Sequence, residues 1–184
     1  MGRFIALLAV VAGCQSMYGT ASEPLVKVRK VPHKAVPEVE PLIPYVDNCA
    51  TNFRGDPTRV SIDAPRSTQL VVTGDGAIQQ AEKIPDPQTR AQVVVTGIGH
   101  YSNALTKDPY SAEATLKLAL AYDKVYRRGC ALKLLARLAT LENHPKFRIS
   151  AQRMIGWVTS EPTWFKGYRK DAIAVLNGAP PSIP

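Results

Sequence analysis

The sequence lacks any hydrophobic run long enough to cross a bilayer as a helix, which takes about 20 apolar residues. Its longest apolar stretch covers only residues 4–12 and follows the cationic start Met1-Gly2-Arg3. A short apolar run behind a positive charge is typical of a secretory signal peptide. The remainder of the 184 residues has room for one domain with its own core.

Catalytic signatures are lacking as well. There is no Gly-x-Ser-x-Gly elbow, no phosphate loop ending in Gly-Lys-Ser/Thr, and no evident pair of nucleophile and base. The segment GIGH at residues 97–100 lacks the third glycine of a dinucleotide loop, so we interpret it as close helix packing. We expect no enzyme and no cofactor, although a carboxylate pair that cleaves sugars would leave no such motif. No metal site is expected either, because no cysteine or carboxylate stands at zinc spacing from the histidines, His33, His100 and His144.

Acidic residues are the minority, since 15 Asp and Glu stand against 23 Lys and Arg for a net charge of +8. Such an excess favours an anionic partner. The interleaved aromatic and arginine residues of RNA-binding chains are missing, and an exported chain seldom meets DNA, so we expect no nucleic acid. Anionic lipid headgroups, cell-wall polymer and acidic proteins are the partner classes that the charge favours.

The residues Val11-Ala12-Gly13-Cys14 resemble the lipobox of bacterial lipoproteins. The resemblance implies that residues 1–13 are a signal peptide and that Cys14 is acylated and becomes the new N-terminus. Several acyl chains would form a permanent membrane anchor. Gln15 lacks the aspartate associated with inner-membrane retention, so the resemblance favours the periplasmic side of the outer membrane. The alternative is cleavage after Ala21, which would discard Cys14.

Residues 14–44 are expected to form the lipid anchor and an extended linker, because frequent prolines exclude a helix. A basic cluster in this linker can attract anionic headgroups, remain a solvated spacer, or belong to a short edge strand with the valines between its charges. The prolines are Pro24, Pro32, Pro37, Pro41 and Pro44, and the basic cluster is Lys27, Arg29, Lys30, His33 and Lys34.

Residues 45–74 are expected to be a loop-rich segment, because residues 45–65 are rich in Asn, Asp, Gly and Pro. They contain Cys49, which either pairs with Cys130 in an oxidising compartment or stays free while Cys130 is a buried helical residue. Residues 67–73 have the composition of a short strand. A helix over residues 68–83 is the alternative, but we prefer a break at Gly74 and a helix over residues 75–83.

Helical periodicity continues to residue 178. A helix is predicted over residues 87–107, then four more segments with apolar stripes and recognisable stops. The first stripe includes Leu116, Ala119, Tyr122 and Tyr126 and stops at Gly129. The others are a stripe from Cys130 to Leu141, one from Phe147 to Val158 that stops at Glu161, and one from Trp164 to Leu176 that stops at Asn177.

Residues 104–145 resemble a tetratricopeptide repeat, a pair of antiparallel helices that stacks on its neighbours. Leu118 and Ala119 stand at the family's Leu-Gly/Ala pair, Tyr122 at its first-helix tyrosine, Ala131 at the helix crossing, and Pro145 near the closing proline. The flanking pairs match less well. The resemblance implies an all-α fold, a short tetratricopeptide-like array of helical hairpins over residues 75–178. Residues 179–184 are expected to be a disordered tail. A generic bundle of helical hairpins is the alternative.

Such arrays resemble scaffolds that bind a peptide or partner helix on their first helices. About three repeats are normally needed for stable stacking, so we hypothesise that the Cys49 loop or a docked protein completes the array. The function expected is a lipoprotein scaffold that assembles an envelope machine, or alternatively a structural lipoprotein that grips cell wall or anionic polymer. The partner-binding residues implied are Lys117, Tyr122, Asp123, Lys124, Tyr126 and Arg127, of which the two tyrosines are shared between the core and the groove, with Leu118, Ala119 and Ala131 as packing residues.

Overall fold

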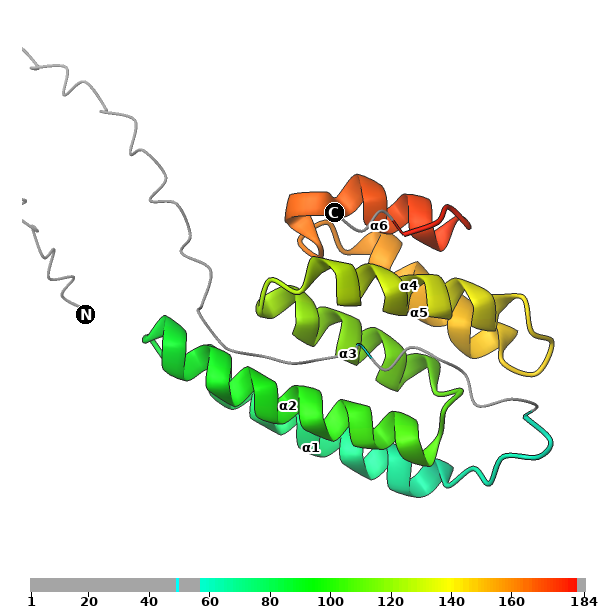
Figure 1. Ribbon diagram of the computed structural model, residues 1–184, viewed down its shortest axis with the longest axis horizontal. Coiled ribbons are helices and arrows are strands. Elements are labelled where there is room, and N and C mark those ends of the chain that lie inside the picture. The colour runs from blue at the N-terminus through cyan, green and yellow to red at the C-terminus, as the bar shows by residue number, and fades with distance from the viewer. Residues whose placement is uncertain (1–48, 50–56, 182–184) are drawn as a thin grey trace, which may run out of the picture. The chain divides into compact units, whose positions relative to one another are not determined.

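The computed structural model describes residue 49 and residues 57–181 (Figure 1). Within these residues the fold is all-α, as expected: six α-helices and one short 3-10 helix, η1, are present and no strand occurs. Of the helices that these residues form, none is both long and apolar enough to cross a membrane. The predicted signal peptide, lipobox and linker with its basic cluster, together with residues 45–48 and 50–56 of the predicted loop-rich segment, lie outside the described residues.

The helices α1, Ala64–Glu82, and α2, Pro87–Lys107, form the first antiparallel hairpin. Each begins after an aspartate whose carboxylate accepts a backbone N–H of the first turn. Asp63 accepts from Arg66 at 3.1 Å, and Asp86 accepts from Thr89 at 2.7 Å. A proline in each first turn fixes φ for the helix where no N–H partner is needed. The helix predicted over residues 87–107 is therefore confirmed.

The break preferred at Gly74 is wrong, and so is the strand over residues 67–73, because α1 runs through both without interruption. The loop-rich segment thus ends before Ala64. Gly74 lies against Tyr101 of α2, and a Cβ atom at Gly74 would lie 2.5 Å from Cε1 of that ring. A Cβ atom at Gly97 would lie 2.9 Å from Cδ1 of Ile78, which confirms close helix packing there. Tertiary packing outweighs the low helix propensity of glycine in α1.

The helices α3, Ala112–Lys124, and α4, Arg128–Glu142, form the second hairpin. Ser111 begins α3, because its hydroxyl accepts the backbone N–H of Ala114 at 3.2 Å. The predicted stop at Gly129 is wrong. The chain leaves α3 at Lys124, Tyr126 adopts the left-handed conformation with φ 59°, and Gly129 lies in the first turn of α4.

The helices α5, Arg148–Ser160, and α6, Arg169–Leu176, are separated by η1, Lys166–Tyr168. The predicted stop at Glu161 is confirmed, whereas α6 begins later than expected, so Trp164 and Tyr168 precede it. The guanidinium of Arg169 donates to four carbonyl groups that follow the end of α5 or belong to its last turn. These are the carbonyls of Val158 at 3.1 Å, Thr159 at 2.9 Å, Glu161 at 2.8 Å and Trp164 at 3.3 Å.

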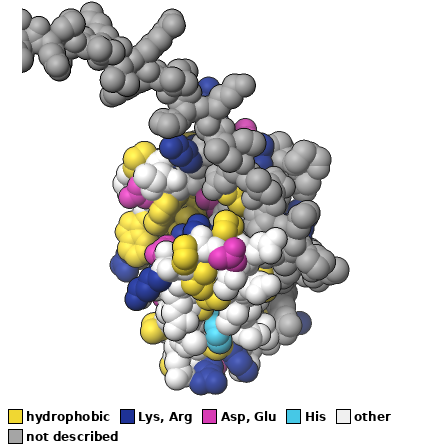
Figure 2. All heavy atoms as spheres, turned by 90° about the vertical axis from the view of Figure 1, so that its left-hand side faces the viewer, with side chains coloured by type: hydrophobic (Ala, Val, Ile, Leu, Met, Phe, Trp, Pro, Cys, Tyr) yellow, Lys and Arg dark blue, Asp and Glu magenta, His cyan; other side chains and the backbone are white. Residues whose placement is uncertain are grey.

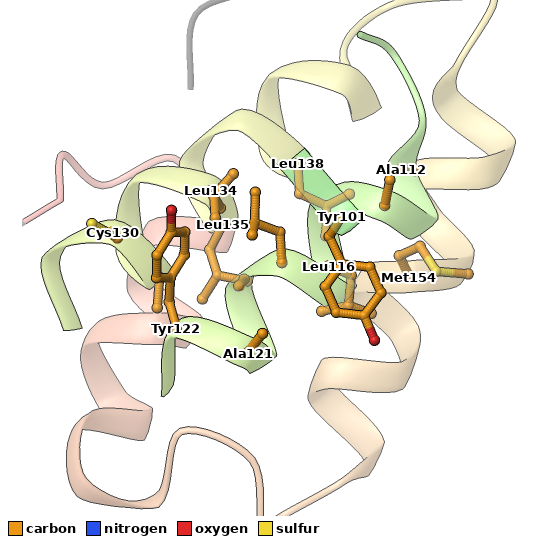
Figure 3. Packing of buried hydrophobic residues seen from close by; sticks show 14 of the residues in the cluster. Tyr101, Ala112, Leu116, Ala121, Tyr122, Cys130, Leu134, Leu135, Leu138 and Met154 are labelled. Carbon is orange, nitrogen blue, oxygen red and sulfur yellow. The ribbon is translucent and has the colours of Figure 1, made fainter. Parts of the chain in front are cut away.

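Successive helices pack on their neighbours in chain order: α1 on α2, α2 on α3, α3 on α4, and α4 on α5. Helix α1 also contacts α3, and α3 contacts α5, while α6 packs against α4 and η1. Side chains of α3 and α4 interdigitate at the centre of the core, and Met154 joins them from α5 (Figure 3). Leu118, Ala119 and Ala131 are fully buried at 0% exposure, so three small or medium side chains let α3 and α4 approach closely.

A disulfide joins Cys49 to Cys130 in the first turn of α4, and their Cα atoms are 5.2 Å apart. Both cysteines are buried. The bond closes a loop with a sequence separation of 81 residues, which contains α1, α2 and α3. Cys49 is therefore fastened to the helical domain through α4.

Candidate interaction surface

The lysines of the predicted partner-binding set are engaged with α1. Lys117 Nζ lies 3.0 Å from Oδ1 of Asp75, and Lys124 Nζ lies 2.9 Å from Oε1 of Glu82. The two lysines are seven residues apart on α3 and the two carboxylates are seven residues apart on α1, so both pairs lie on one line between the helices. Their side chains are partly exposed, so each pair contributes little to stability. Their geometric effect is to align α3 with α1.

Asp123 is also used inside the fold. Its carboxylate accepts the hydroxyl of Tyr168 at 2.8 Å and the backbone N–H of Phe165 at 3.3 Å. Burial, together with the charge of Asp123, raises the pKa of the Tyr168 hydroxyl above its usual value. Arg128 completes the contact, because its guanidinium lies 5.2 Å from the centre of the Tyr168 ring and pairs with Asp171. Asp123 therefore holds the segment before α6 against the α3–α4 turn.

The two tyrosines of the predicted set differ sharply in exposure. Tyr122 is 1% exposed, so of the core and groove positions that the sequence leaves open for it, its side chain occupies the core. Tyr126 is 39% exposed and lies in the α3–α4 turn beside the half-buried Arg127. Figure 2 views the domain from the side on which this turn lies in Figure 1, and shows hydrophobic side chains gathered between acidic and basic ones. Of the predicted set, Tyr126 and Lys124 are the members exposed to solvent.

A second exposed surface lies on α5. One side of this helix is buried through Ala151, Met154 and Val158, as its apolar stripe predicts. The opposite side exposes a group of residues that we call the α5 outer face. It carries the most exposed large hydrophobic residue among those the structure describes, Ile149 at 76%, and Trp157 at 45%. The α5 outer face consists of Ile149, Arg153, Gly156 and Trp157.

The α5 outer face is basic. The helix contains Arg148 and Arg153, both exposed, and no acidic residue. Glu142 of α4 lies at the edge of α5, where its Oε1 accepts the side-chain amide of Gln152 at 3.3 Å. The start of α5 is fixed by Phe147, whose ring stacks on Tyr110 with 4.8 Å between centroids. A rigid helix thus presents apolar and guanidinium groups together.

The sequence carries a signal for this surface that periodicity does not use. Ile149 and Trp157 are large hydrophobic residues on the side of the helix opposite its buried stripe. Two such residues on the same side of one helix indicate an interaction surface, whereas single exposed hydrophobic residues are common and indicate nothing.

No group of three His, Cys, Asp or Glu side chains in the described part of the chain is placed to hold a metal ion. The arrangement on α5 offers apolar contact and positive charge, which is the chemistry of a binding surface. Comparisons with protein-family models, with curated proteins and with solved structures gave no match to this chain. Function is therefore inferred from the residues and their geometry.

Proposed function

We propose that the chain is a lipid-anchored scaffold of the bacterial cell envelope. In this proposal Cys14 holds it on the periplasmic side of the outer membrane, and the helical domain binds a protein component of an envelope machine for secretion, pilus or motility function, or barrel assembly. The observation that carries the proposal is the α5 outer face, where Ile149 and Trp157 are exposed on a well-packed helix. Exposed hydrophobic groups of this kind mark protein interaction sites.

The order of helix packing supports a tetratricopeptide-like array. The helices α1, α3 and α5 contact in sequence, and the α1–α2 hairpin packs on the α3–α4 hairpin. Ala119 and Ala131 are buried where the α3 and α4 helices approach, as the resemblance implies for residues at the crossing. The array is irregular, because α1 and α2 are longer than α3 and α4 and because η1 separates α5 from α6.

The cysteines support an exported location. Val11-Ala12-Gly13-Cys14 resembles a lipobox, and the pair Cys49 and Cys130 forms a disulfide. Disulfides persist in oxidising compartments such as the periplasm and are rare in the cytosol. Both features are expected of a lipoprotein that faces the periplasm.

Changing Cys14 to alanine is expected to move the protein from the membrane fraction to the soluble fraction, because the acyl chains supply the anchor. The measurement is fractionation of cells, with release of the wild-type chain by detergent but not by salt. Cys49→Ala is the matched control, and it should remain with the membranes. A mature N-terminus after Ala21 without lipid, found by mass spectrometry, would contradict the anchor.

A benzophenone amino acid at position 157 is expected to crosslink one envelope protein in intact cells, because Trp157 lies on the α5 outer face. The measurement is an irradiation-dependent adduct that forms even when salt is raised beforehand, identified by mass spectrometry. The same amino acid at Gln92, an exposed position of α2, is the control and should give no such adduct. Equal labelling at both positions, or none at 157, would count against the scaffold.

The alternative, a structural lipoprotein that grips cell wall or anionic polymer, is favoured by one observation. Basic side chains are exposed on α5, on η1 and at the start of α6, namely Arg148, Arg153, Lys166 and Lys170. Binding to polymer through these charges would be lost at a few hundred millimolar salt, because exposed charges are screened over short distances. Retention of isolated cell wall at low salt only, with no protein adduct at position 157, would favour this alternative.

A further inference from the structure

The α5 outer face lies at one end of the stack of helices. The first helices contact in the order α1, α3, α5, and α5 buries Ala151, Met154 and Val158 on the side opposite to this face. The terminal repeats of a helical array normally show a polar outer surface, which keeps the array soluble. Here Ile149 and Trp157 are exposed instead, so the end of the array resembles a surface on which another helix packs.

Gly156 points to a helix as the occupant. It lies inside α5, where glycine costs about 1 kcal/mol relative to alanine, and a Cβ atom there would meet no atom within 4 Å. At Gly74 and Gly97 the missing Cβ lets a neighbouring helix approach. The same property at Gly156, next to exposed Trp157, allows the backbone of a partner to come close. Gly99 of α2 and Gly76 of α1 are equally open, but α2 exposes no large hydrophobic residue and α1 exposes one, Val72, whereas α5 exposes two.

Spacing and charge define the partner further. Ile149, Arg153 and Trp157 follow one another at intervals of four residues, so they form one ridge along α5. The ridge from Ile149 to Trp157 is about 12 Å long at 1.5 Å per residue, which matches the two-turn spacing of apolar anchors on an amphipathic helix. A second copy of this chain is a poor occupant, because a symmetric contact would bring the arginines of both copies together.

We propose that the α5 outer face binds an amphipathic helix of a partner protein that is acidic beside its apolar stripe. The helix packs on Ile149 and Trp157, crosses α5 at Gly156, and places carboxylates against Arg153. This rests on the proposed function as a protein-binding scaffold and specifies the chemical class of the partner.

The test uses the full chain purified in detergent and a synthetic helix-forming peptide of about 18 residues, with a leucine stripe flanked by glutamates. A second peptide has lysines in place of the glutamates. Dissociation constants are measured by fluorescence anisotropy of the labelled peptides. The glutamate peptide is expected to bind at least about tenfold more tightly than the lysine peptide, and Arg153→Glu is expected to reverse this preference.

Gly156→Ala separates binding from folding. Its Cβ meets nothing in the fold, so the melting temperature is expected to rise with the gain in helix propensity, while the dissociation constant of the glutamate peptide rises about tenfold. Gly99→Ala is the matched control, since it should raise the melting temperature similarly and leave binding unchanged. Unchanged binding in Gly156→Ala would overturn the close crossing.

Other outcomes would overturn the acidic helix itself. Equal binding of the glutamate and lysine peptides, or binding of neither peptide, would overturn the inference that the partner is an acidic helix. So would binding of phosphatidylglycerol vesicles through Trp157 without peptide binding, which would identify a lipid surface as the occupant. A protein adduct at position 157 in cells combined with failure of both peptides would reject this inference and leave the proposed scaffold function standing.

Discussion

Loss of the disulfide between Cys49 and Cys130 is expected to lower the free energy of unfolding by about 4 kcal/mol. The bond closes a loop with a sequence separation of 81 residues, and on the chain-entropy model a loop of that size restricts the unfolded chain by about 4 to 5 kcal/mol. Small domains have only about 5–15 kcal/mol of stability in total. The measurement is urea unfolding of Cys49→Ser/Cys130→Ala in the Cys14→Ala background.

Reductant supplies the control for this prediction. Dithiothreitol is expected to shift the unfolding midpoint of the Cys14→Ala chain towards that of the chain without the disulfide, and to leave the latter where it is. Alanine at position 130 avoids placing a hydroxyl in a buried position. Identical unfolding midpoints without reductant, for the Cys14→Ala chain and for the chain that also lacks the disulfide, would show that closing the loop does not contribute to stability.

Gly74→Ala is expected to lower the free energy of unfolding by about 1–3 kcal/mol, although alanine favours a helix more than glycine does. The new Cβ would lie 2.5 Å from the ring of Tyr101. That ring has little freedom to move, because Tyr101 is 1% exposed and its hydroxyl donates to Asp75 at 2.7 Å. Helices α1 and α2 would have to separate. Thermal and urea unfolding measure the effect.

Gly76→Ala is the matched control two residues along the same helix. Its Cβ would meet no atom within 4 Å, so the substitution is expected to stabilise the chain by about 0.5–1 kcal/mol through helix propensity alone. Gly74→Ala should therefore lower the free energy of unfolding and Gly76→Ala should raise it. If both stabilise the chain, the approach of α1 to Tyr101 is not a tight contact.

The positions of most helices could be predicted from local patterns. Pro87, the capping Asp86 and an apolar stripe mark α2, and an apolar stripe alone marks α5, so these signals lie in the helices or directly beside them. The continuity of α1 could not be predicted in the same way. Glycine at position 74 signals a break locally, and its actual role depends on Tyr101 in another helix. Likewise, the left-handed residue after α3 is Tyr126, where sequence preference favours a glycine.

The candidate surface could be predicted only in part. Sequence identifies Lys117, Asp123 and Lys124 as polar positions of a first helix, but their partners are supplied by α1 and by the segment before α6. Because those partners are distant along the chain, periodicity alone treats the three residues as exposed. The α5 outer face needed the three-dimensional packing, which shows that no described helix covers Ile149 and Trp157.

The two ion pairs between α1 and α3 together fix how far along its axis one helix lies relative to the other. Asp75 and Glu82 are separated by the same seven residues as Lys117 and Lys124, with contacts of 3.0 Å and 2.9 Å. A slip of α3 by one helical turn, about 5.4 Å, would open both contacts at once. Only one longitudinal setting of the two helices satisfies all four charges, so weak individual bonds still select a unique alignment of neighbouring hairpins.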